Sequence, residues 1–209
     1  SVNDSLRRNG KIAFEHVRHE ETAAFAAGAE ASLTHKLTVC AGSSGPGNLH
    51  LINGLFDCHR NRVPVLAIAS HIPQSEVGLN YFQETHPESL FKECSCFCEL
   101  VSNPKQMPEI LFRAMNAAIG NQDVAVIVLP GDVAVMEMEI DELPVWNQPR
   151  LPHIVPQHDD IEEMAAHLET GKRITLFCGA GCEGAHDEVV ELAKRLQAPV
   201  VHAFRGKEW

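Results

Sequence analysis

Short apolar runs rich in Val, Ile and Leu alternate along this chain with longer segments that have the spacing of amphipathic helices. Several of these runs are apolar without a break, which is typical of strands that are covered on both faces in a parallel sheet. The alternation predicts an α/β fold with a doubly wound parallel sheet. The predicted strands are residues 12–17, 37–41, 63–69, 98–101, 124–129, 174–178 and 200–202, and the predicted helices are residues 20–33, 47–60, 104–120, 159–169 and 183–196.

The alternation breaks at residues 136–158, where prolines fall among charged residues and no period is present. Proline ends helices and is rare inside sheets, so this stretch predicts a linker between two domains. Only a helix, a strand, a second helix and a second strand follow in residues 159–209. That is about half of a doubly wound sheet, which predicts that the second domain is incomplete.

Composition excludes several classes of protein. Asp and Glu number 28 against 17 Lys and Arg, and the resulting formal charge of -11 opposes binding to nucleic acid. No segment approaches the roughly 18 consecutive apolar residues of a membrane-spanning helix, and we expect no export signal. The 7 cysteines do not fit a fully paired disulfide framework, so we expect reduced thiols in a cytoplasmic protein.

Three of the cysteines, at positions 94, 96 and 98, alternate with other residues. In a strand this spacing places the three side chains on one face and not around a tetrahedral metal ion. We therefore expect buried thiols at these positions rather than a metal or redox site.

The polar cluster Arg18-His19-Glu20-Glu21 closes the first predicted strand and opens an alanine-rich helix. A carboxylate at this junction lies where the positive end of a helix dipole meets the end of a strand, which is a frequent place for a site in open α/β folds. The same acid can also do no more than stabilise the first turn of the helix. A zinc-protease motif does not fit, because the position of its second histidine holds Ala23.

Two glycine-rich turns and one polar loop follow predicted strands. The turns at residues 42–48 and 178–184 each connect a strand to a helix, so their backbone N–H groups can approach a ligand closely, although close packing alone also explains them. The first turn has neither a P-loop nor a dinucleotide fingerprint. The loop at residues 78–86 lies at the sheet edge where such folds place their sites, and by itself it is interpreted as a surface loop.

Several of these motifs, in this order, resemble the N-terminal domain of thiamin-diphosphate-dependent enzymes, and a subset is similar to the quinone-reducing pyruvate oxidase branch of that family. The first resemblance is carried by residues 18–21, 23–24, 42–47, 64–68 and 82–84, and the second by residues 40–58, 178–186 and 198–207. The resemblance implies a subunit of three α/β domains. One domain would bind the aminopyrimidine of the cofactor, the central domain a flavin, and the third domain the diphosphate with magnesium. Residues 1–135 would then be the pyrimidine-binding domain without its first strand-helix unit, residues 136–158 a linker, and residues 159–209 the first half of the central flavin-binding domain.

The resemblance implies that the chain is a fragment, inactive alone, of an oxidase that uses thiamin diphosphate, FAD and Mg and converts pyruvate, quinone and water to acetate, CO2 and quinol. The magnesium ligands would belong to the missing C-terminal domain. The family forms homotetramers with active sites between subunits, and this branch contacts the inner face of the cell membrane through a C-terminal segment that is absent here. An acetohydroxyacid synthase-like carboligase and a non-catalytic binding or assembly module remain open as alternatives.

Residue roles also follow from the resemblance. It implies that Glu20 is catalytic: its carboxyl group hydrogen-bonds a ring nitrogen of the aminopyrimidine and exchanges a proton near neutral pH. The other implied contacts are Ser44, Gly45, Pro46 and Gly47 with the cofactor, Phe82 and Gln83 with the substrate, and Gly179, Gly181 and Arg205 with the flavin. No residue of this chain is expected to bind a metal ion.

Overall fold

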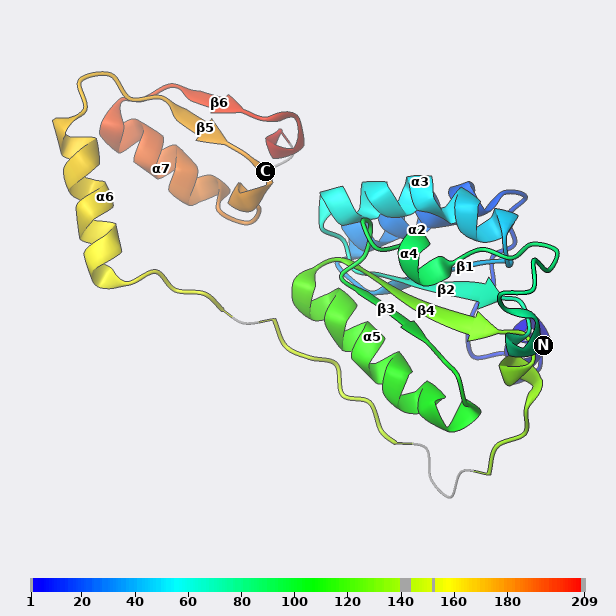
Figure 1. The fold of residues 1–209 in the computed structure, drawn as a ribbon. Coiled ribbons are helices and arrows are strands. Elements are labelled where there is room, and N and C mark those ends of the chain that lie inside the picture. Colours follow the sequence, from blue (N-terminus) through cyan, green and yellow to red (C-terminus); the bar gives the residue numbers. More distant parts are fainter. Residues whose placement is uncertain (1, 140–143, 152, 208–209) are drawn as a thin grey trace. The chain divides into compact units, whose positions relative to one another are not determined.

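A computed structural model describes residues 2–139, 144–151 and 153–207 (Figure 1). It divides the chain into two compact units, residues 1–151 and residues 152–209. Residues 140–143 and 152 of the predicted linker lie outside the described residues, as do residues 1, 208 and 209 of the two predicted domains. The predicted domain limits stay a prediction.

The first unit is built on a four-stranded parallel sheet in the order β1-β2-β4-β3. The strands are β1 (Thr38–Gly42), β2 (Val65–His71), β3 (Phe97–Leu100) and β4 (Val124–Pro130). The two central strands, β2 and β4, are apolar and buried along almost their whole length, because both of their faces are covered. Parallel pairing brings the carboxyl ends of all four strands to the same edge of the sheet.

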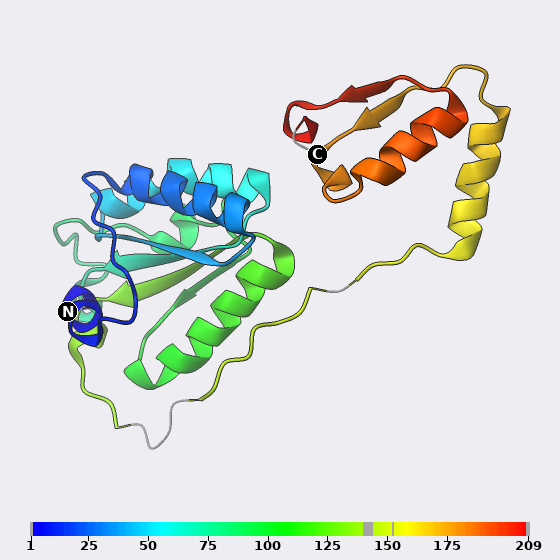
Figure 2. The ribbon, with the colours of Figure 1, turned by 180° about the vertical axis from the view of Figure 1, so that it is seen from behind.

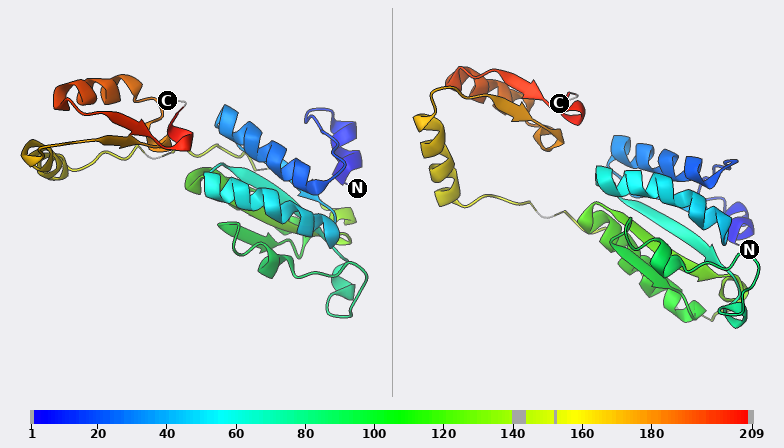
Figure 3. Two further views of the ribbon diagram at one scale, coloured as in Figure 1. Left: turned by 90° about the horizontal axis from the view of Figure 1, so that it is seen from above. Right: turned by 45° about the horizontal axis from the view of Figure 1, so that its top comes forward.

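Helices cover both faces of this sheet (Figure 1, and from behind Figure 2). Helices α2 (Glu20–Thr34) and α3 (Pro46–Asn61) lie side by side on one face, as both views of Figure 3 show, with the short helix α4 (Pro87–Leu90) near α3. Helix α5 (Met107–Asn121) covers the other face. The predicted α/β class with a parallel sheet is therefore confirmed. The short 3-10 turns are Gln74–Glu76, Pro104–Gln106, Val133–Val135, Ala180–Cys182 and Phe204–Gly206.

Two apolar cores follow from this layering. The core under α2 and α3 joins small helix residues to the inner faces of the strands, and its members include Ala24, Ala27, Leu51, Leu55, Cys58, Val65, Phe91 and Val126. The core under α5 includes Leu66, Ile110, Ala114, Ala118, Ala125 and Ile127. Because consecutive strand residues point to opposite faces, β4 contributes Val126 to the first core and its neighbours Ala125 and Ile127 to the second.

The second unit contains α6 (His158–Thr170), β5 (Leu176–Cys178), α7 (His186–Leu196) and β6 (Val200–His202). Its two strands pair in parallel and are joined through α7, which makes a βαβ unit. No residue of α6 or α7 is buried among those described, and Phe177 in β5 is 72% exposed. None of the helices in the described parts of the chain is long and apolar enough to cross a membrane.

The prediction of a strand at residues 12–17 is wrong. These residues are irregular, and all of them except Val17 are exposed, with Ile12 63% and Phe14 51% accessible. No strand of the described residues pairs with them. The sequence prediction also missed α1 (Val2–Asn9), which buries no residue and is held by local ion pairs from Asp4 to Arg7 and Arg8, at 2.8 and 2.7 Å.

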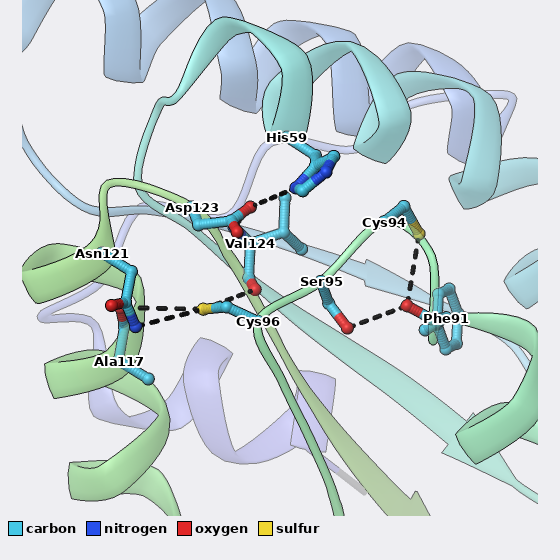
Figure 4. Close-up of polar contacts among 9 residues, drawn as sticks. All are labelled: His59, Phe91, Cys94, Ser95, Cys96, Ala117, Asn121, Asp123 and Val124. Atoms are coloured by element: carbon cyan, nitrogen blue, oxygen red, sulfur yellow. Dashed lines mark hydrogen bonds and ion pairs between the residues drawn. The ribbon is translucent and has the colours of Figure 1, made fainter.

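The prediction for the three alternating cysteines, of which Figure 4 shows Cys94 and Cys96, is correct only in part. Strand β3 begins only at Phe97, so the residues before it do not share one strand face: Cys94 is buried, Cys96 is exposed and Cys98 is intermediate. Cys96 lies 3.4 Å from the carbonyl oxygen of Val124. All seven cysteines are free thiols, and the described residues contain no group of three side chains that could hold a metal ion.

Candidate functional site

Glu20, the first residue of α2, lies at the carboxyl edge of the sheet beside the turn that follows β1. Its Oε1 accepts a hydrogen bond from the Oγ of Ser43 at 3.3 Å, and its Oε2 lies 3.2 Å from the Nδ1 of His50 on α3. The side chain is 28% exposed. The carboxylate is therefore fixed through both oxygens and still reaches solvent.

Neighbouring side chains hold the start of α2 against α3. His19 is the N-cap residue of α2, where its Nδ1 accepts a hydrogen bond from the backbone N–H of Glu21 at 3.3 Å. Its ring stacks on the ring of His50, with centroids 4.2 Å apart. The Nδ2 of Asn53, one turn further along α3, donates to the carboxylate of Glu21. The two acids at the helix start thus bind different residues of the same partner helix.

Glycines on α3 make this approach possible. A Cβ on Gly47 would lie 2.9 Å from the Oε1 of Glu20 and would also contact the Oγ of Ser43. About two turns further along, a Cβ on Gly54 would lie 2.5 Å from the Cβ of Ala24. The spacing of α2 and α3, and with it the position of the carboxylate, depends on residues without side chains at both positions.

The pKa of Glu20 is lowered from its ordinary value. The main cause is the hydrogen bond from its own backbone N–H, and the side chains of His50 and Ser43 lower it further against the opposing effect of burial. The carboxyl group without cofactor therefore favours its ionised form at the start of a helix, where the helix dipole also favours negative charge. The expected proton exchange near neutral pH concerns the carboxyl group that faces a ring nitrogen of the cofactor, and it stays a prediction.

The structure brings the glycine turn and the loop at residues 78–86 together. Gly45 has φ +68, in the left-handed region that favours glycine, and a Cβ there would lie 2.8 Å from both the Cβ and the carbonyl oxygen of Gln83. Pro46 occupies the first turn of α3, which its fixed φ suits. Ser44 lies in the same turn, whereas Phe82 is 79% exposed.

The carboxylate of Glu84 organises this loop from within. It accepts hydrogen bonds from the backbone N–H groups of Gly78, at 2.5 Å, and Tyr81, at 3.2 Å. These bonds lower the pKa of Glu84, with the bond from Gly78 as the main cause. The loop that carries Phe82 and Gln83 is therefore a structured turn and not a loose connection.

The three residues predicted to contact a flavin belong to the second unit. A Cβ on Gly179 or Gly181 would meet no atom within 4 Å, so internal packing does not require glycine there. Arg205 precedes Gly206, whose added Cβ would lie 3.0 Å from the Cα of Gly179. The fold thus places Gly179 beside the turn that contains Arg205, and the flavin role of all three residues stays a prediction.

Sequence reasoning missed Ser43 and His50, the two side chains that bind Glu20. A signal for His50 was present, because residues 47, 50 and 54 follow the i, i+3, i+7 spacing of one helix face. Two of these residues are glycines, which marks the face that approaches another helix closely. Ser43 carried no such signal, since any residue of the turn could have faced the acid.

Comparison with known proteins finds two family matches in this chain. Residues 1–90 match the family described as "Thiamine pyrophosphate enzyme, N-terminal TPP binding domain", and residues 161–209 match "Thiamine pyrophosphate enzyme, central domain". Thiamine pyrophosphate is another name for thiamin diphosphate. Both matches are to domains of the thiamine pyrophosphate enzyme family, and together they cover most of the chain.

Of three relatives that are similar to this chain, one is uncharacterized and the other two carry different printed functions. The chain is 59% identical over 209 residues, all of its length, to an "Uncharacterized 42.6 kDa protein in isoamylase 3'region" of Pseudomonas amyloderamosa and covers 53% of that protein. It is 30% identical over 212 residues, 99% of the chain, to a pyruvate oxidase of Lactiplantibacillus plantarum, and 32% identical over 206 residues, 95% of the chain, to an acetolactate synthase of Arthrospira platensis. It spans 35% of each of the last two proteins.

The residues around Glu20 fit the pyrimidine part of thiamin diphosphate. A fixed, ionised and partly exposed carboxylate is a suitable acceptor for a protonated ring nitrogen. The neighbouring turn has glycines at 45 and 47, where side chains would fill the space next to Gln83 and Glu20. Binding of this cofactor is therefore consistent with the shape and the chemistry of the site.

Proposed function

We propose that the chain, as part of a longer protein, forms the pyrimidine-binding region of a thiamin-diphosphate-dependent enzyme that acts on pyruvate. The observation that carries the proposal is the carboxylate of Glu20, held by Ser43 and His50 at the carboxyl edge of the sheet. The family match of residues 1–90 supports the choice of cofactor. The printed names of the two functionally named relatives support an oxo acid substrate.

The proposed roles of the residues follow from their positions. Bound thiamin diphosphate supplies a thiazolium carbon that becomes a nucleophile when it loses its proton. Glu20, already ionised, accepts the hydrogen bond of a protonated pyrimidine nitrogen and stabilises the proton there. Ser43 and His50 keep the two carboxylate oxygens in place, and Gly47 leaves room for the ring beside them. Gln83 and Phe82 border the substrate.

Among the reactions open to this family, we propose oxidation of pyruvate to acetate and CO2, with FAD as the electron acceptor and quinone as its oxidant. The segments Cys58-His-Arg-Asn61 and His50-Leu-Ile52 are similar to the oxidase branch. Gly179, Gly181 and Arg205 are the proposed flavin contacts, and magnesium is assigned to a domain outside this chain. A homotetramer with its site between subunits, located in the cytoplasm at the inner face of the membrane, completes the proposal.

A carboligase is the second candidate, because the acetolactate synthase relative is as similar to this chain as the oxidase. Product analysis on the full-length enzyme separates the two. With 13C-labelled pyruvate, thiamin diphosphate, Mg2+ and a soluble quinone, NMR spectra should show acetate that forms in step with quinol. Accumulation of acetolactate without quinone reduction would contradict the oxidase assignment, and failure to convert pyruvate at all would favour a non-catalytic module.

A further inference from the structure

Two cysteines of the second unit lie at the two ends of one glycine-rich turn. Cys178 is the last residue of β5, and Cys182 is the last residue of the 3-10 turn Ala180–Cys182 that follows it. The backbone N–H of Cys182 donates to the carbonyl oxygen of Gly179 at 3.0 Å, so the turn folds the chain back toward the end of the strand. Both cysteines are half-buried free thiols.

The two thiols interact directly. The side chain of Cys178 forms a hydrogen bond with the side chain of Cys182, so the two sulfur atoms are neighbours. Burial is the main cause that raises the pKa of Cys178, and the hydrogen bond with Cys182 and the charge of its thiolate raise it further. The hydrogen bond favours the protonated form of Cys178, which means that Cys178 donates its proton to the sulfur of Cys182. Cys182 is therefore the thiol that is placed to react first as a nucleophile.

The turn is fixed at the strand and open between the cysteines. The carbonyl oxygen of Cys178 accepts a hydrogen bond from the backbone N–H of Ala203 at 2.8 Å. A Cβ on Gly179 or Gly181, in contrast, would meet no atom within 4 Å. A disulfide needs the two Cβ atoms about 3.8 Å apart. Since no neighbouring side chain confines the residues between the cysteines, the turn can adjust to that separation.

The other thiols of the chain have different surroundings. Burial raises the pKa of Cys40 to about 12. The remaining four thiols lie against backbone carbonyl oxygens and not against another sulfur: Cys58, Cys94, Cys96 and Cys98. Two half-buried thiols that bind each other are therefore a particular feature of the turn at residues 178–182.

We propose that Cys178 and Cys182 form a redox-active pair, which closes to an internal disulfide by exchange with a low-molecular-weight disulfide such as oxidised glutathione. The thiolate of Cys182 attacks one sulfur of oxidised glutathione and releases the first glutathione thiolate. The thiolate of Cys178 then attacks the sulfur of Cys182 and releases the second. Two electrons pass from the cysteine pair to glutathione, and the two released thiolates take up the two protons that the cysteines lose.

Oxidation of the pair changes the turn that it spans. The new bond closes a ring around Gly179 and Gly181, so the open turn becomes a covalently fixed one. This chemistry does not require the flavin role proposed for these two glycines, and it can be tested without measuring enzyme activity.

The test uses the full-length protein under native conditions, in mixtures with a rising ratio of oxidised to reduced glutathione. The reaction is stopped with acid, and the free thiols are then labelled with N-ethylmaleimide in denaturant. Trypsin places the cysteines of this chain in three peptides that mass spectrometry distinguishes: residues 174–194 with Cys178 and Cys182, residues 37–60 with Cys40 and Cys58, and residues 93–105 with Cys94, Cys96 and Cys98.

We expect the peptide of residues 174–194 to lose two hydrogen atoms and to take up no maleimide, at a ratio at which the other two peptides contain no internal disulfide. Complete maleimide labelling of this peptide at every ratio would overturn the proposal. So would bound glutathione on both of its cysteines, or closure of all three peptides at the same ratio.

Two variants assign the exchange to the named thiols. Cys178→Ser removes the thiol that releases the second glutathione, so one glutathione should stay bound to Cys182 at the ratio at which the wild-type pair is closed. Cys96→Ser removes an exposed thiol outside the pair and should leave the closure of residues 174–194 unchanged. Wild-type protein that retains as much glutathione on this peptide as Cys178→Ser would contradict the role of Cys178.

Discussion

Gly54 lies where α3 passes close to α2, and its replacement by alanine tests whether this packing sets the spacing of the two helices. The new methyl group would lie 2.5 Å from the Cβ of Ala24 and 2.8 Å from the backbone nitrogen of Phe25. A backbone atom cannot rotate away, so the helices must separate, and overpacking of this kind costs about 1–3 kcal/mol. The better helix propensity of alanine stabilises the folded state by about 1 kcal/mol and offsets part of this cost. We therefore expect a net loss of up to about 2 kcal/mol in the free energy of unfolding of the first unit.

Gly120 in α5 provides the matched control. A Cβ there would meet no atom within 4 Å, so Gly120→Ala should stabilise the same unit by up to about 1 kcal/mol through helix propensity alone. Native-state hydrogen exchange in urea, read on peptides of the first unit by mass spectrometry, separates this unit from the second. A Gly54→Ala protein as stable as the Gly120→Ala protein would refute the reasoning that glycine is needed at the contact of α2 and α3.

Two further predictions concern titratable groups. Because the pKa of Glu20 is lowered below 4.5, its ionised form contributes stability that is fully present above that value and is lost as the pH falls through the lowered pKa. The stability advantage of the wild type over Glu20→Gln should therefore shrink between about pH 6 and about pH 3 in urea titrations, and an advantage that grows would contradict the hydrogen bonds to Glu20. Burial raises the pKa of Cys40 and of Cys58 to about 12. Burial also raises the pKa of Cys96, but this residue is exposed, whereas Cys40 and Cys58 are buried. A thiol reagent should modify Cys96 before Cys40 and Cys58 under native conditions, as mass spectrometry of peptides would show, and earlier labelling of Cys40 would contradict the described packing.

The central strands of the sheet could be predicted from the sequence because burial on both faces leaves an unbroken apolar run. Strands β2 and β4 show this, and both lie within or close to the predicted ranges. Residues 12–17 have a similar apolar content without a partner strand, and the sequence carries no sign of that difference. Helix α1 depends on local ion pairs of Asp4 with two arginines and buries nothing, so no core pattern marks it.

The candidate site could be predicted only in part, because some of its contacts join segments that are distant in the sequence. Glu20 and the glycine turn are recognisable because their residue types and spacing are unusual at a strand-helix junction. Their contacts with His50 and Gln83 join segments that are far apart in the sequence, and only the packing of α2 against α3 and of the loop against Gly45 brings them together. The lowered pKa of Glu20 is due mainly to the hydrogen bond from its own backbone N–H at the helix start, and the contacts with His50 and Ser43, which could not be deduced from the sequence, lower it further.

The most direct test of the proposed role of Glu20 is the turnover of the full-length enzyme with Glu20→Gln, compared with Glu21→Gln as a control. Both changes remove one carboxylate from the start of α2, but Glu21 binds Asn53 and lies outside the pair of contacts made by Ser43 and His50. With thiamin diphosphate bound in both variants, we expect Glu20→Gln to lower kcat at least about 100-fold, which is the rate factor that a positioned proton-transfer group contributes. The kcat of Glu21→Gln should stay close to that of the wild type. Near-normal turnover of Glu20→Gln with the cofactor bound would contradict the account.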